Sequence, residues 1–75
     1  MNTYKVKRPE GEMEVNSSKE LTGVIICKNS RDGGWAVSLT SAKNVRGVLN
    51  RESKINRPWL SDWQVAEFEK KEEAL

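Results

Sequence analysis

The chain has no histidine and a single cysteine, Cys27. Without histidine it lacks the commonest general base, the commonest metal ligand and the usual activator of a Ser or Cys nucleophile. One cysteine allows neither a disulfide within the chain nor a cysteine-based zinc site. Because the sequence also has no phosphate-binding glycine loop, we expect no enzymatic activity, no bound metal and no cofactor.

The sequence also has no long apolar run. The longest, Val24–Cys27, is far shorter than the roughly 20 apolar residues that span a bilayer. It has the length of a buried strand, which predicts that the Cys27 thiol is buried rather than reactive. The charged, proline-containing start of the chain does not resemble a secretory signal peptide. We therefore expect a soluble, cytoplasmic protein without a membrane span.

Charge is abundant and nearly balanced, with 13 Lys and Arg residues against 11 Asp and Glu residues in a chain of 75. This small excess does not by itself predict a nucleic-acid partner. The distribution is uneven, however, since Glu52 is the sole acid of residues 43–57. We interpret this segment first as a solvated face and second as a nucleic-acid footprint. Its basic residues are Lys43, Arg46, Arg51, Lys54 and Arg57.

Short strands separated by turns dominate the first fifty or so residues. Residues 3–7 and 12–15 alternate between apolar and polar side chains and flank a loop with proline and glycine. Residues 35–40 alternate in the same way after a polar turn, and residues 45–49 are expected to form a further short strand. Four or five such strands are typical of a small barrel or sandwich.

Residues 17–28 carry two conflicting patterns. Ser17 followed by Glu20 is a capping box, and the apolar spacing after it is helical. The β-branched residues of the same segment, together with Gly23, favour a strand. We expect a strand over about residues 21–28. The alternative, with residues 17–28 helical, is an α+β fold similar to a β-grasp.

The C-terminal segment differs from the rest in its pattern. Ser61 and Gln64 have the spacing of a helix N-cap and its partner, after a breaker at Pro58. This predicts a helix from about residue 62 and divides the chain into a β domain, residues 1–56, and a helical extension, residues 57–75. The aromatic residues expected to dock this helix on the domain are Trp59, Trp63 and Phe68.

A glycine turn and tryptophan, Asp32–Trp35, stand at the spacing from Gly47 that SH3 domains use between the same features. Glu12–Val15 and Leu21 fit the same register. Over about residues 3–55 the chain therefore resembles an SH3 domain. The resemblance implies a mainly β fold with a five-stranded small barrel, here followed by the C-terminal helix.

The resemblance also implies a groove for proline-rich peptides in the polyproline II conformation. Trp35 corresponds to the groove tryptophan, and Glu10 and Glu12 to acidic loop positions that pair with a basic residue of the peptide. The family's proline and second tyrosine are replaced by Asn50 and Ser53, so a degenerate groove is expected. The peptide-binding positions implied in this way are Tyr4, Glu10, Glu12, Asp32, Trp35, Asn50 and Ser53.

Two functions follow as expectations. The first is a non-catalytic protein–protein interaction module that binds a peptide, with a groove that the C-terminal helix covers or modifies. The second is a small β-barrel protein that binds nucleic acid through the basic residues of 43–57 and an exposed aromatic side chain.

Overall fold

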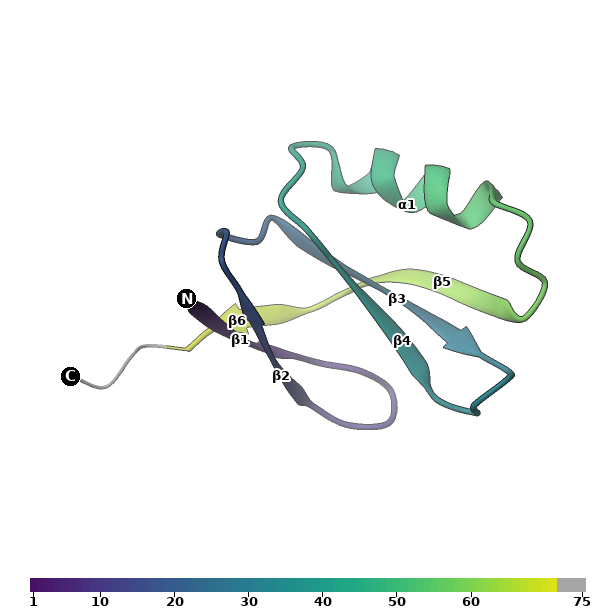
Figure 1. The fold of residues 1–75 in the computed structure, drawn as a ribbon, viewed down its shortest axis with the longest axis horizontal. Coiled ribbons are helices and arrows are strands. Elements are labelled where there is room, and N and C mark those ends of the chain that lie inside the picture. The colour runs from purple at the N-terminus through teal and green to yellow at the C-terminus, as the bar shows by residue number, and fades with distance from the viewer. Residues whose placement is uncertain (72–75) are drawn as a thin grey trace.

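The computed structural model describes residues 1–71, which form two antiparallel three-stranded sheets and one helix (Figure 1). Sheet A has the strand order β2-β1-β6, and sheet B the order β4-β3-β5. The elements in chain order are β1 (Asn2–Val6), β2 (Met13–Ser17), β3 (Gly23–Asn29), β4 (Trp35–Thr40), α1 (Val45–Lys54), β5 (Leu60–Ala66) and β6 (Phe68–Lys70).

The alternating patterns of the first half form the first four strands. β1 and β2 make a hairpin in which Val6 lies opposite Met13, and β3 and β4 make a second one in which Ile26 lies opposite Val37. The expected strand over residues 21–28 is confirmed as β3, so the helical alternative for residues 17–28 is wrong. Apolar residues on both faces of β3 favour this outcome, because a central strand is covered on both sides.

The helix expected from residue 62 is wrong as far as the described residues reach, because β5 and β6 occupy this segment. β5 pairs with β3 from Val24 opposite Ala66 to Asn29 opposite Leu60, with a bulge near Asp62, whose φ is 53°. Capping signals stabilise a helix only weakly, whereas β5 provides hydrogen-bond partners for the backbone groups on the second edge of the buried strand β3. The end of the expected helix, beyond Lys71, lies outside the described residues.

The chain after residue 56 is consequently part of both sheets and not a helical extension. β5 completes sheet B, and β6 pairs with β1 in sheet A. Glu67 connects the two strands, and its carbonyl accepts from the backbone N–H of Lys7 at 2.9 Å. β5 and β6 therefore carry the chain from one sheet to the other, as Figure 1 shows. No closed barrel forms within the described residues, so the five-stranded SH3-like barrel is not found, and the fold is mainly β with one helix.

Residues 45–49 begin α1 instead of the expected strand. The side chain of Asn44 caps this helix, because its Oδ1 accepts from the backbone N–H of Gly47 at 2.9 Å. Val45, Val48 and Leu49 are half-buried, while Arg46 and Asn50 are exposed. This is the spacing of an amphipathic helix. The helix is too short and too polar to cross a membrane, and it is the only helix of the described residues.

The main core lies between the two sheets. Its buried residues are Tyr4, Val6, Leu21, Val24, Ile26 and Ala66, with Met13, Val15, Trp35, Val37 and Phe68 packed against them. Tyr4 is 1% exposed, its hydroxyl accepts from the backbone N–H of Leu21 at 3.0 Å, and Phe68 meets its ring edge-on. The opposite face of β3, with Ile25 and Cys27, lies toward α1. Sheet B is thus covered on both faces, by sheet A and by α1.

Candidate functional site

The acidic and tryptophan positions of the expected peptide groove come together only in part. Glu10 Oε1 accepts from the backbone N–H of Trp35 at 3.1 Å, and Asp32 Oδ1 accepts from the backbone N–H of Gly34 at 2.9 Å. Glu10 also pairs with Arg8 at 2.7 Å. These carboxylates therefore bind the turn before β4, and the side chain of Trp35 packs against the core.

The other positions expected in that groove lie elsewhere. Tyr4 is buried, and Glu12 pairs with Lys5 at 3.5 Å. Asn50 and Ser53 belong to α1, where the Ser53 hydroxyl donates to the Asn50 carbonyl at 3.0 Å. Because α1 covers the face of sheet B opposite to the one that carries Trp35, these two residues do not share a groove with it.

The aromatic residues expected to dock a C-terminal helix have three different surroundings. Phe68 packs on Tyr4, with 5.8 Å between the ring centroids. Trp63 lines the space beneath α1, and the guanidinium of Arg57 lies 5.1 Å from its ring centroid. Trp59 precedes β5 and carries Arg31 over its ring. Trp59 is in a loop, and Trp63 and Phe68 are in strands.

A small pocket of about 110 Å³ lies between α1 and sheet B, lined by Cys27, Glu52, Arg57 and Trp63 among others. A terminal nitrogen of Arg57 donates to the Glu52 carbonyl at 2.7 Å and to its carboxylate at 3.1 Å. Burial raises the pKa of the Cys27 thiol, and the charge of Arg57 opposes this rise only in part. The pocket therefore holds a neutral thiol, which is a poor nucleophile, beside an ion pair between two of its own lining residues.

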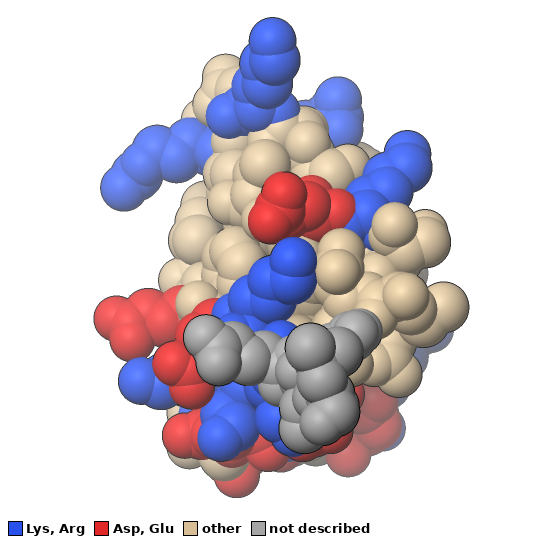
Figure 2. Space-filling model, turned by 90° about the vertical axis from the view of Figure 1, so that its left-hand side faces the viewer, with Lys and Arg blue, Asp and Glu red and all other residues tan. Residues whose placement is uncertain are grey.

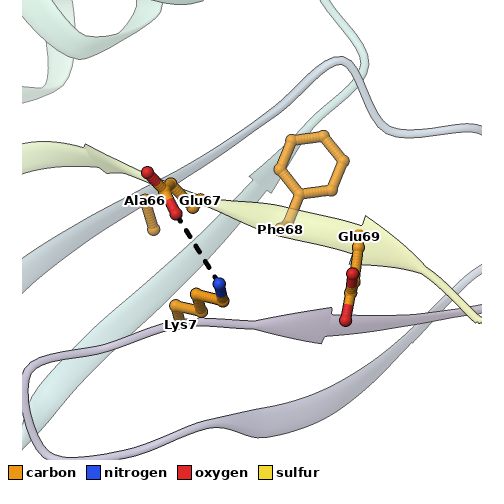
Figure 3. Close-up of a pocket in the computed structure, with 5 residues that line it drawn as sticks. All are labelled: Lys7, Ala66, Glu67, Phe68 and Glu69. Atoms are coloured by element: carbon orange, nitrogen blue, oxygen red, sulfur yellow. Dashed lines mark ion pairs between the residues drawn. The ribbon is translucent and has the colours of Figure 1, made fainter.

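A second pocket lies where β5 passes into β6. Figure 3 shows Lys7 facing Glu67, with Phe68 and Glu69 on opposite sides of the strand. The Lys7 ammonium is 3.8 Å from the Glu67 carboxylate, and both side chains are exposed. The charges of this pair compensate each other, but Glu69 also lines the pocket, so its lining carries a net negative charge. Within residues 1–71, no group of His, Cys, Asp or Glu side chains has the arrangement of a metal site.

The cations of sheet A and its loops are mostly neutralised by acids. Besides the pairs of Lys5, Lys7 and Arg8, Lys70 lies 3.6 Å from Glu20, and Lys71 binds Glu14. Lys71 lowers the pKa of the Glu14 carboxyl, mainly through their hydrogen bond and then through its charge. This part of the surface consequently alternates in sign, as the mixed red and blue of the lower part of Figure 2 shows.

The helix presents a different surface, whose exposed cations make no ion pair with an acid among residues 1–71. Glu52, the sole acid of α1, is half-buried and pairs with Arg57. The remaining cations of this region are exposed, and none makes an ion pair with a described residue. In Figure 2 blue side chains project from the upper part of the molecule, where α1 lies in Figure 1. We define the basic face as Lys43, Arg46, Arg51 and Lys54.

The geometry of α1 determines the direction of this basic face. Val45, Val48 and Leu49 are turned toward sheet B, so positions 46, 50 and 54, one turn apart, lie on the outer side. Arg51 and Lys54 also stand in the last turn, where the helix dipole favours positive charge. The arrangement can bind an extended polyanion without first breaking an ion pair.

No protein-family model, no curated protein and no solved structure matches this chain. The sequence identified the basic residues of 43–57 but not their placement on a helix. It gave no signal for the contact between Arg31 and Trp59, because these residues come from separate turns that meet only in the folded chain.

Proposed function

We propose that this protein binds nucleic acid through the basic face of α1, mainly by contacts to phosphates. One observation carries the proposal: the cations of this face are exposed and have no acidic partner among the described residues, whereas most cations of sheet A are paired. An unpaired cation can replace the counterions of a phosphate without losing an interaction of its own.

The salt dependence of binding follows from the number of phosphate contacts. If each cation of the basic face neutralises one phosphate, the logarithm of the association constant falls with the logarithm of salt concentration with a slope of about −3 for a single strand. Affinity then drops roughly 50-fold between 50 and 200 mM salt. Fluorescence anisotropy of a labelled oligonucleotide over this range measures the slope directly.

A charge-matched pair of variants tests where binding occurs. The first carries glutamine at every position of the basic face, and we expect it to lose most of the affinity and most of the salt dependence. The control carries Lys→Gln at Lys5, Lys7, Lys19 and Lys70, which gives the same net charge. We expect the control to bind as the native protein does. Equal losses in both variants, or no binding by the native protein, would contradict the proposal.

Peptide binding is a second candidate, supported by one contact. Glu10 approaches the backbone of Trp35, so an acidic side chain and a half-buried tryptophan are adjacent, as the SH3 resemblance implied. A proline-rich peptide with an arginine would have to compete with Arg8 for Glu10. An NMR titration that follows the Trp35 indole N–H tests this candidate, and the absence of a shift at millimolar peptide would exclude it.

A further inference from the structure

Arg31 and Trp59 form a stacked pair at one end of sheet B. The guanidinium carbon of Arg31 lies 3.8 Å from the centroid of the Trp59 ring. Arg31 is exposed, and it makes no ion pair with a described residue. The pair therefore offers a flat cationic surface that is paired with no carboxylate of the described part of the chain, at a cation–π distance that keeps the guanidinium in place.

The backbone beneath this pair is held by hydrogen bonds. Both the backbone N–H and the hydroxyl of Ser30 donate to the Trp59 carbonyl, at 2.9 and 3.2 Å. The N–H of Leu60 donates to the Arg57 carbonyl at 3.0 Å and closes the turn that carries Trp59. The stacked pair is thus built on the joined ends of β3 and β5, which limits the entropy that binding would cost.

The pair also lies close to the basic face along the chain. Residues 55–59 lead from the C-terminal end of α1 to the start of β5 (Figure 1). Five residue steps separate Lys54 from Trp59, and they span at most about 18 Å even when fully extended. Arg51 and Lys54, in the last turn of the helix, are therefore within reach of the same ligand as Arg31.

We infer that the nucleic acid bound by the basic face is single-stranded, and that one of its bases stacks on Arg31 over Trp59. This inference rests on the proposed function. The phosphates next to this base contact Arg51 and Lys54. Single-strand binding proteins combine a cationic track with planar side chains, and both arginine and aromatic planes accept unpaired bases. A duplex keeps its bases stacked inside the helix and has no free base to place on this pair.

The inference is tested with three ligands that carry the same number of phosphates: an oligothymidylate, an abasic oligodeoxynucleotide and a DNA duplex. We expect the native protein to bind oligothymidylate about tenfold more tightly than the abasic strand, which is within the range measured for stacking one base. The duplex should bind no more tightly than the abasic strand. Anisotropy at one fixed salt concentration provides all three affinities.

Two substitutions locate the stacking site. Arg31→Lys keeps the charge but removes the plane, and Trp59→Leu removes the ring beneath it. We expect each to abolish the preference for oligothymidylate while binding to the abasic strand changes little. Arg8→Lys, the same replacement at a residue outside both the basic face and the stacked pair, is the matched control and should keep the preference.

The possible results separate the two proposals. If the native protein binds none of the three ligands, the proposed function itself is wrong. If it binds oligothymidylate and the abasic strand equally, or the duplex best, phosphate binding stands and the stacking site is wrong. If the preference exists but survives both Arg31→Lys and Trp59→Leu, the base stacks elsewhere and the inference about this pair is overturned.

Discussion

At the scale of single residues, Tyr4 both packs in the core and holds the chain segment just before β3 in place. Its ring is buried between the sheets and its hydroxyl accepts from the backbone N–H of Leu21. Tyr4→Phe keeps the ring and leaves that buried N–H without a partner, which costs about 1–3 kcal/mol. We expect urea denaturation to show a free energy of unfolding that is lower by this amount, with an unchanged fold. An unchanged midpoint would show that water or another group takes the place of the hydroxyl.

Cys27 is a second residue whose environment predicts its chemistry. Burial raises the pKa of its thiol above the ordinary value of 9.0, and the residue is 4% exposed. Because the thiolate is the reactive species, we expect the native protein to react with Ellman's reagent at pH 8 far more slowly than the same protein in denaturant. Equally fast reactions would mean that the space beneath α1 opens readily.

At the scale of elements, the contact between α1 and sheet B depends on a glycine. A Cβ added at Gly23 would stand 2.6 Å from Cγ1 of Val45, the first residue of the helix. We expect Gly23→Ala to destabilise the fold by about 1–3 kcal/mol through this overpacking. The cost should shrink in a Val45→Ala background, where the valine methyl groups are absent.

Gly34→Ala is the matched control for this experiment, because a Cβ at Gly34 meets its nearest atom at an ordinary 3.5 Å. Denaturant unfolding of the single and double variants gives the coupling between Gly23 and Val45. A cost of Gly23→Ala that is the same in both backgrounds would contradict the observed packing of α1 on β3.

The hydrogen bond between Glu14 and Lys71 joins β2 to the chain beyond β6, and its contribution to the stability of the fold depends on pH. Lys71 holds the pKa of Glu14 below the ordinary 4.5, so the folded state favours the carboxylate more than the unfolded chain does. The contribution to stability is therefore present above pH 4.5 and is lost as the pH falls through the lowered pKa. We expect Lys71→Gln to raise the pKa of Glu14 in an NMR titration. An unchanged pKa would mean that the bond does not form in solution.

Elements were predictable where local pattern and tertiary pairing agree. The alternation of residues 35–40 and the apolar run of β3 predicted strands that the structure confirms. The helix predicted from the capping signal at Ser61 is wrong because this segment pairs as a strand with the open edge of β3, which is far away in sequence. The helix at Val45–Lys54 had a readable signal, Asn44 followed by apolar residues at helical spacing, but the short apolar stretch of residues 45–49 was interpreted as a further strand.

At the scale of the whole molecule, charge is separated in space as well as along the chain. In the direction from α1 to the mixed surface of sheet A, which is vertical in Figures 1 and 2, the molecule measures 27 Å, against a Debye length of about 10 Å at 0.1 M salt. The acids of one end therefore do not cancel the cations of the other, although the net charge is only +2. The sequence revealed the basic segment, but the identification of a face needed the helix and the ion pairs elsewhere.

We expect nucleic acid to contact α1 and the Arg31–Trp59 pair, and not sheet A. An amide NMR titration of the native protein with oligothymidylate tests it residue by residue. If nucleic acid binds there, the largest shifts occur at Lys43–Lys54 and at the Trp59 indole N–H, with β1 and β2 unchanged. No shifts at low salt, or shifts centred on the β1–β2 hairpin, would contradict it.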